Sequence, residues 1–414
     1  MATIRSSKPR GKTSLLNRKN LLLLIIAISI LHIWSIYYFF KSDSFIKSTS
    51  SLPSSASNAR EFPSFVTVLM PSVVNPKDQA KRLKAIANTW GPAARAVFVV
   101  HDNSELHDFP TLSDISSAIN HPSFPIILQI PPSIPEDQGV QRLQYVIRTI
   151  STLFQSSEFA FFVNDHTFVI PEKLGLFLSQ LDPSQQIYAG HALKDKKNDF
   201  AFNSGAAGYV LSRTTIHNLL LKFDEKDPQC VPPSGNNWLN GNPGLVTAQC
   251  LYHALGVSTM DTRQSLDTES NQYGGHQFHA YGIVRTATAD VDNWYRNKHE
   301  GFSSGKLGIA FSSGYDQSIV GGGACCSSNT ISFHYVESYE TLALYAIRKE
   351  IHEKQLLSQA QITDNELKKL IQQKWPDNDS NGWVGGYAEP LPKDTETQKW
   401  TMFLGGFRKI LDFN

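Results

Sequence analysis

The sequence has little excess charge of either sign. Its 38 lysines and arginines almost balance its 37 aspartates and glutamates, which leaves a net charge of +1 over 414 residues. A chain this close to neutral has no overall electrostatic attraction to nucleic acid, so we expect no nucleic-acid partner. No internal repeat is found, and the 41% of hydrophobic residues suffice for one large core or two moderate ones.

Cysteine is scarce, with Cys230, Cys250, Cys325 and Cys326 as the four present. The C-x-x-C spacing of zinc sites is missing, so two disulfides are favoured over a tetrathiolate zinc site. Three pairings are possible. A bond between the neighbours Cys325 and Cys326 would be strained, so we expect those two to bond elsewhere.

Charged residues are missing altogether between Leu21 and Phe40, and no acidic residue precedes Asp43. These 20 residues would rise about 30 Å as a helix, the thickness of a bilayer core. The run ends in bulky aromatic residues suited to a membrane interface, not in the cleavage site of a signal peptide. With the basic residues before it, the run predicts a cytosolic tail over 1–20 and a transmembrane signal anchor over 21–40.

Large apolar groups are also few over residues 41–63, a Ser-rich segment that predicts an unfolded stem. Folded structure is expected from residue 64, in a lumen or outside the cell. Strand-like runs at 65–70, 94–100, 125–130 and 159–163 alternate with helical patterns at 76–90 and 138–154. This β-α-β order predicts an α/β fold with a Rossmann-like, mainly parallel sheet.

The later segments are less regular. We expect short strands at 187–190 and within 202–212, a helix over 213–223, loops at 224–245 and 262–330, and helical structure over 338–373. The tail beyond Trp375 has Pro and Gly throughout and is expected to be partly ordered at best. Asn378 begins a good N-glycosylation sequon, N-D-S.

The stretch from Phe159 to Lys173 carries the strongest functional signal. An apolar run that suits a strand buried on both faces breaks into Asn164-Asp165-His166-Thr167. Open α/β sheets hold their ligands at the carboxyl ends of such strands. Oxygen and imidazole groups at that point suit a divalent cation, which in turn suits a diphosphate. The alternative is a polar turn in which Asp165 caps the next helix.

Several separated segments, in one order, resemble the motifs of a known family. They are RLKAIANTW (82–90), FVNDHTFV (162–169), the small-residue run before YVLS (188–212), AQCL (248–251), and GACCS (323–327) followed by ISFHYV (331–336). Together they resemble glycosyltransferase family 31, and within it the core 1 β1,3-galactosyltransferase branch.

This resemblance implies a GT-A fold over residues 64–345, followed by a C-terminal helical and irregular extension over 346–414. It also implies an inverting transfer of galactose or another hexose from a UDP-sugar to a glycan or glycoprotein in β1,3 linkage. The implied ligand of the enzyme is Mn²⁺, held by Asp165, His166 and His334. The residues implied to bind the nucleotide sugar are Thr89, Trp90, Asn164, Asp165, Asn203 and Gly205.

The sequence departs from the family pattern where acids are expected. Asn164 and His166 replace the first and last acids of the Asp-x-Asp motif, and Pro243-Gly244 stand where the family has a Glu-Asp pair. Neither proline nor glycine can accept a proton, so no catalytic base is assigned. The acids nearby in sequence are Asp224, Glu225, Asp227 and Asp261.

Three hypotheses remain open at this level. The first is an active β1,3-galactosyltransferase-like enzyme with an unusual His166/His334 metal site and a displaced base. It would be a single-pass type II protein of the Golgi membrane with its catalytic domain in the lumen. The second is a catalytically weak or inactive relative that serves as a chaperone or partner of an active paralogous glycosyltransferase. The third is a Golgi-resident module that binds an acceptor without using a donor.

Overall fold

The structure is a computed structural model, and it describes residues 63–71, 76–101, 104–106, 108–111, 124–135, 137–194, 200–231, 243–262, 277–279, 282–284, 326–358, 362–375 and 391–411. The predicted cytosolic tail and signal anchor, nearly all of the stem, and the sequon at Asn378 lie outside these residues. Within the described ranges, no helix combines the length and apolar surface that crossing a bilayer needs.

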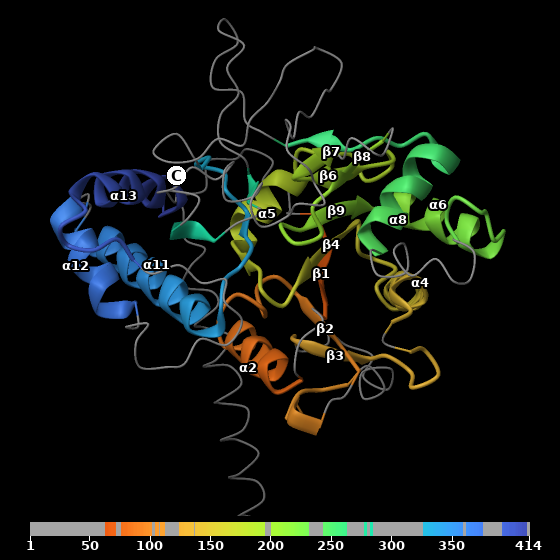
Figure 1. Cartoon of the computed structure of the whole chain (residues 1–414), viewed down its shortest axis with the longest axis horizontal. Coiled ribbons are helices and arrows are strands. Elements are labelled where there is room, and N and C mark those ends of the chain that lie inside the picture. The colour runs from red at the N-terminus through yellow and green to blue at the C-terminus, as the bar shows by residue number, and fades with distance from the viewer. Residues whose placement is uncertain are drawn as a thin grey trace, which may run out of the picture. The chain divides into compact units, whose positions relative to one another are not determined.

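A mainly parallel sheet organises the described residues, with seven strands in the order β10-β6-β9-β4-β1-β2-β3 (Figure 1). Strands β1, β2, β3 and β4 are mutually parallel, β10 is parallel to β6, and β9 is antiparallel to β4 and β6. The strands are β1 (Phe65–Met70), β2 (Ala96–Val100), β3 (Ile126–Gln129), β4 (Phe159–Asn164), β6 (Tyr188–Gly190), β9 (Tyr209–Ser212) and β10 (Met260–Asp261). The predicted α/β class and its mainly parallel sheet are confirmed.

Helices cover both faces of this sheet because its central strands are apolar on both sides. Along β1, Phe65 and Leu69 belong to one buried cluster, whereas Val66 and Val68 belong to the other. The first cluster includes residues of α2 (Pro76–Ala87), η1 (Ser104–Leu106), α5 (Pro171–Leu178), α11 (Ser338–Ser358), α12 (Asp364–Lys374) and α13 (Thr397–Leu411). The second includes residues of α4 (Gly139–Leu153), α6 (Arg213–Asp224), α8 (Pro243–Gln249) and the π-helical turn η2 (Cys250–Ala254). The result is a three-layer α/β/α arrangement.

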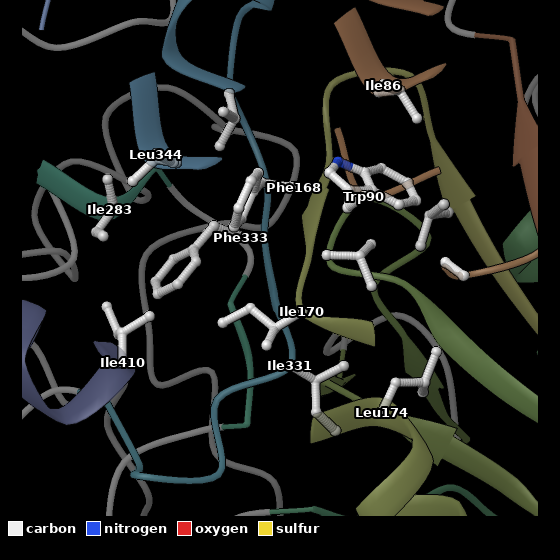
Figure 2. Packing of buried hydrophobic residues seen from close by; sticks show 14 of the residues in the cluster. Ile86, Trp90, Phe168, Ile170, Leu174, Ile283, Ile331, Phe333, Leu344 and Ile410 are labelled. Carbon is white, nitrogen blue, oxygen red and sulfur yellow. The ribbon is translucent and has the colours of Figure 1, made fainter. Parts of the chain in front are cut away.

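Two smaller sheets lie beside the main one. In the first, β12 (Ser332–Phe333) pairs parallel to β11 (Phe278–His279) and antiparallel to β5 (Phe168–Val169). In the second, β7 (Ala192–Lys194) pairs antiparallel to β8 (Ala201–Asn203). Figure 2 shows Phe168 and Phe333 packed in the core that the first small sheet shares with α2 and α11. The β5–β12 pairing therefore fixes the residues after β12 beside the turn that follows β4.

The C-terminal extension contains a helix that the sequence did not single out. Of the tail beyond Trp375, expected to be partly ordered at best, the structure describes residues 391–411, and these include α13, whose Trp400, Phe403 and Phe407 are buried in the first cluster. Spacings of three and four residues place these aromatic rings on one helix face. The predicted division at 345/346 lies within α11.

The disulfide prediction is corrected in part. Cys230 and Cys250 form a disulfide that ties the segment after α6 to η2. That bond uses both distant cysteines, so the expectation that Cys325 and Cys326 bond to them is wrong. Cys325 lies outside the described residues.

Candidate functional site

The carboxyl ends of β1 and β4 mark the point where this sheet type binds ligands. Met70 and Asn164 are register partners at that edge. The chain extends the sheet from β1 through β2 to β3 on one side, and through β4 on the other. A reversal of this kind is a topological switch point, and ligands bind in the crevice outside the strand ends there.

The turn after β4 is held by Asn164. Its side-chain oxygen accepts a hydrogen bond from the backbone N–H of His166 at 3.0 Å and lies 3.0 Å from the Thr167 hydroxyl. That hydroxyl also lies 2.9 Å from the carbonyl oxygen of Ala206. The hypothesis of a polar turn is therefore right about the turn, although Asn164 and not Asp165 stabilises it.

Asp165 forms a buried ion pair with Arg82 of α2. Its Oδ2 lies 3.0 Å from both Nε and Nη2 of the guanidinium. The two residues are 2% and 3% exposed, so water does not screen the pair. A carboxylate engaged in this way is a poor ligand for a cation, because the guanidinium already neutralises it and repels a second positive charge.

His166 and His334 lie close together although they are far apart in the sequence. Their ring centroids are 6.1 Å apart. The β5–β12 pairing and a hydrogen bond from the backbone N–H of Val336 to the carbonyl of His166, at 2.9 Å, hold the two segments side by side. The sequence motifs that suggested a shared site are therefore neighbours in space.

Glu337 completes this buried polar cluster. Its Oε1 lies 3.5 Å from His166 Nδ1, and its Oε2 lies 3.7 Å from Arg82 Nη1. Its backbone N–H donates to the Glu340 carboxyl group at 2.8 Å, at the start of α11. Burial raises the pKa of Glu340 to about 8, with the charge of Glu337 adding to the effect and the hydrogen bond from Glu337 N–H opposing it. Glu340 is therefore mostly protonated at neutral pH.

The predicted manganese ligands do not make a convincing metal site. Asp165, His166 and His334 are neighbours, but Asp165 is bound to Arg82 and the two remaining candidates are imidazoles, which bring no negative charge. Across the part of the chain that the structure describes, no group of three or more His, Cys, Asp or Glu residues is arranged to hold a metal ion. Manganese prefers hard oxygen ligands, so this donor set does not fit it.

The small-residue segment after β8 borders the same turn. Asn203 is 1% exposed, and neither polar atom of its side-chain amide has a hydrogen-bond partner among the described residues. Gly190 makes room for that side chain, because a Cβ at this glycine would lie 3.1 Å from Asn203 Cγ. Gly205 faces open space, and a Cβ there would meet nothing within 4 Å. Both predicted residues therefore lie in the segment that Thr167 ties to the end of β4.

Thr89 and Trp90 lie elsewhere. They follow α2, which returns the chain from the carboxyl edge of β1 to the amino end of the parallel strand β2. The Thr89 hydroxyl donates to the carbonyl of Ala85 at 2.8 Å, and Trp90 is 2% exposed in the core seen in Figure 2. Both residues stabilise the fold and do not join the cluster around His166.

A positively charged group lies near the same edge. Arg142, in the first turn of α4, has its Nη1 3.0 Å from Nε2 of His101, which follows β2. The side-chain amide of Gln129, at the end of β3, donates to the carbonyl of His101 at 3.3 Å. These groups extend the polar edge from β4 across β1 to β2 and β3.

The positions considered for a missing base do not supply one. Pro243 and Gly244 begin α8, and a Cβ at Gly244 would meet nothing within 4 Å. The nearby acids Asp224, Glu225 and Asp227 pair with the basic side chains of Arg148 and Lys222. The side chain of Asp261 lies outside the described residues.

The sequence interpretation missed Arg82, Glu337 and Glu340. Arg82 stands in the RLKAIANTW segment, and Glu337 follows the FHYV segment directly. The apolar residues Ala85 and Ile86, three and four positions after Arg82, were an available signal that Arg82 faces the core, but its partner could not be read from local sequence.

Comparison with known proteins finds a distant sequence similarity to a galactosyltransferase. The chain is 28% identical over 211 residues to glycoprotein-N-acetylgalactosamine 3-beta-galactosyltransferase 1 of Xenopus laevis, a match that covers 50% of this chain and 51% of that relative. The chain thus spans about half the length of this curated relative. No family model matches the chain.

A solved structure gives a weaker likeness. The crystal structure of a glycosyltransferase involved in the glycosylation of the major capsid of PBCV-1 matches with 11% identity and a TM-score of 0.28, over 48% of this chain and 81% of that one. A score this low supports no argument. The sequence similarity relates the chain to glycosyltransferases, while family 31 stays a prediction.

Proposed function

We propose that this protein transfers a hexosyl group, galactose in the first instance, from a UDP-sugar to a hydroxyl group of a glycan or glycoprotein. One observation carries the proposal. The turn Asn164–Thr167 and the segment 332–337 meet at the ligand-binding edge of the sheet. The similarity of half of the chain to a galactosyltransferase supports the choice of reaction.

The reaction is a substitution at the anomeric carbon of the donor. The acceptor oxygen forms a bond to that carbon, the bond to the diphosphate oxygen breaks, and UDP leaves with the bonding electrons. The leaving group therefore needs hydrogen-bond donors and positive charge around it. Arg142 and the imidazoles of His101, His166 and His334 are the groups at this edge that can supply them.

The donor sugar needs polar groups of a different kind, because its hydroxyls are neutral. The buried amide of Asn203 offers one acceptor and two donor hydrogens and uses none of them within the described residues. Leaving such an amide without partners costs free energy on the order of 1–3 kcal/mol. A hydroxyl of the donor sugar is the partner we propose.

The finer details rest on the resemblance and on residues outside the described ranges. We include inversion at the anomeric carbon, the β1,3 linkage and a lumenal Golgi location in the proposal. Anchoring by residues 21–40 belongs to it as well, because their apolar length suits a bilayer. We leave manganese out, since Arg82 occupies the carboxylate that would hold it.

A second candidate has its own support. The ion pair of Asp165 with Arg82, and Pro243-Gly244 in place of a Glu-Asp pair, remove the acidic groups that the related enzymes are expected to use. These features favour a relative that keeps the fold without the activity and assists or binds an active glycosyltransferase.

One experiment separates the two candidates. Purified full-length protein is incubated with UDP-galactose and a panel of glycan and glycopeptide acceptors, and both released UDP and glycosylated product are measured. We expect product that accumulates with time and protein concentration. Binding of UDP without any product across UDP-hexoses would support the second candidate, and the absence of both would contradict the proposal.

A further inference from the structure

A surface hollow of about 430 Å³ lies at the edge of the main sheet opposite to the candidate site. Gln186 and Ser258 each lie two residues before the start of a strand, β6 and β10 respectively, and these strands are parallel. Strand β6 runs in the same direction as β4, because both are antiparallel to β9. The hollow is therefore at the amino edge of the sheet, and the six residues of β4 separate it from the candidate site by roughly 20 Å.

This amino-edge hollow lies between a loop, the helix α6 and the segment before β10. It is lined by Ser184, Gln185, Gln186, Thr214, Asn218 and residues 256–258. Its size falls within the range of about 300–1,000 Å³ that is typical of sites for small molecules.

The loop that forms one wall is held in place by its own hydrogen bonds. Oδ1 of Asp182 accepts from the backbone N–H of Ser184 at 2.9 Å and from its hydroxyl at 2.7 Å, and Oδ2 accepts from Gln185 Nε2 at 3.4 Å. The Thr214 hydroxyl donates to the carbonyl of Pro183 at 3.0 Å, which ties the loop to α6. A wall fixed in this way loses little conformational freedom when a ligand binds.

Two side-chain amides meet at the hollow. Nδ2 of Asn218 donates to Oε1 of Gln186 at 3.0 Å. This bond fixes both amides and leaves Asn218 Oδ1 as an acceptor and Gln186 Nε2 as a donor for a ligand. The hydroxyls of Ser184 and Thr214 keep acceptor lone pairs, so the walls offer donors and acceptors from several directions.

The chemistry of the lining selects the class of ligand. Each described side chain that lines the amino-edge hollow is uncharged, so a phosphate or a carboxylate finds no charged partner among them. An apolar ligand would take water away from the amides and hydroxyls without replacing its hydrogen bonds. A neutral sugar carries hydroxyls around its ring, each of which both donates and accepts.

Apolar groups lie where a sugar ring can use them as well. Val257, only 7% exposed, is the apolar side chain of the lining. Leu221, 47% exposed, lies three residues after Asn218 and hence on the same face of α6. The carbon-bound hydrogens of a sugar, or of the next unit of a glycan, can pack on these side chains.

We infer that the amino-edge hollow is a second carbohydrate-binding site that takes a neutral sugar unit of a glycan. A glycan held there tethers the molecule that carries it, whether or not a sugar is transferred at the other edge of the sheet. The inference does not depend on the proposed function, because it concerns binding alone.

The test uses the full-length protein and the methyl glycosides of galactose, glucose, N-acetylgalactosamine and N-acetylglucosamine. Saturation-transfer NMR should show saturable binding of at least one of them, with a Kd on the order of 1–10 mM for a ligand of this size. UDP-galactose should not displace it. Hydrogen exchange with the bound glycoside present should slow in peptides that cover 182–187 and 213–218, and not in peptides that cover 162–169.

Substitutions locate the site. Gln186→Leu and Asn218→Leu should each raise the Kd of the glycoside about tenfold, as expected for loss of a good hydrogen bond. Their affinity for UDP should stay within about threefold, because the donor is proposed to bind at the opposite edge. Gln372→Leu is the matched control, since it removes an exposed amide of α12 that is bonded to Asp394, and it should change neither value.

Three results would overturn the inference: no saturable binding of any of the four glycosides, displacement of the glycoside by UDP-galactose, or equal Kd values for the two hollow variants and the control. Thermal unfolding should show that all variants are folded. A protein that binds a glycoside in the hollow and transfers no sugar would contradict the proposed function and leave this inference standing.

Discussion

Arg82 and Asp165 form an ion pair in the interior of the protein, with Asp165 Oδ2 at 3.0 Å from both Nε and Nη2 of Arg82. The pair joins α2 to the turn after β4. Asp165 is the one acid that the altered motif retains, and in this structure its carboxylate is engaged by a guanidinium.

Breaking this pair should destabilise the protein strongly. Arg82→Met leaves Asp165 buried without its partner, and removal of one member of a buried ion pair costs about 3–5 kcal/mol. Urea unfolding followed by circular dichroism measures the loss. Arg148→Met is the control, since the Arg148–Asp224 pair is 52% and 58% exposed and should contribute about 1 kcal/mol or less. Equal losses in the free energy of unfolding of the two variants would show that the buried pair contributes no more to stability than the exposed pair.

Glu340 should make stability depend on pH. Its pKa in the folded protein is about 8 and lies above its ordinary value of 4.5, so the folded state holds the proton more tightly. Its contribution to stability is complete below pH 4.5 and is lost as the pH rises through 8. Each pH unit in this window lowers the free energy of unfolding by up to about 1.4 kcal/mol.

Glu340→Gln removes this titration, because a glutamine resembles the protonated acid at every pH. The difference in the free energy of unfolding between wild type and variant should change steadily from pH 5 to pH 8, in favour of the variant as pH rises. Urea unfolding at four pH values measures it. If the free energy of unfolding varied with pH in the same way for both proteins, Glu340 would not be the group that titrates in this window.

Asn203 should distinguish a UDP-sugar from UDP. Asn203→Leu removes an amide that has no partner among the described residues, so the free protein should lose little stability. Affinity for UDP should stay within about threefold, whereas the KM for the UDP-sugar should rise by about tenfold, as expected for loss of a good hydrogen bond. Asn218→Leu, which alters an amide bonded to Gln186, is the control and should change neither value. An equal loss of affinity for UDP and for the UDP-sugar would contradict a contact between Asn203 and the sugar.

The disulfide between Cys230 and Cys250 should stabilise the protein. The two cysteines are 20 residues apart, and closing a loop of that length contributes about 3 kcal/mol in the chain-entropy estimate. Replacing both cysteines with alanine should lower the free energy of unfolding, measured by urea unfolding, by a matching amount. An unchanged free energy of unfolding in this variant would contradict a stabilising role of the bond.

The parallel sheet could be predicted because its evidence is local. The apolar runs over β1, β2, β3 and β4, separated by helical periods, dictate β-α-β units and hence parallel strands. The helix α13 was missed because the prolines and glycines of the tail outweighed the apolar spacing of Trp400, Phe403 and Phe407.

The candidate site was only half predictable for a similar reason. Asn164, Asp165 and His166 follow a strand and were found by position, and His334 was found through its motif. The contacts that decide their chemistry are not local. The strands β5 and β12 have only two residues each, too few to show a periodic pattern in the sequence. The partner of the buried Arg82 depends on how α2 packs on the sheet.

The central claim is that a nucleotide sugar binds where the end of β4 meets the segment after β12. Photo-crosslinking with a UDP-sugar analogue, followed by peptide mapping of the full-length protein, tests this most directly. We predict labelled peptides that contain residues 162–169 or 331–337 and label that UDP-galactose displaces. Label confined to other segments, or label that UDP-galactose does not displace, would contradict the account.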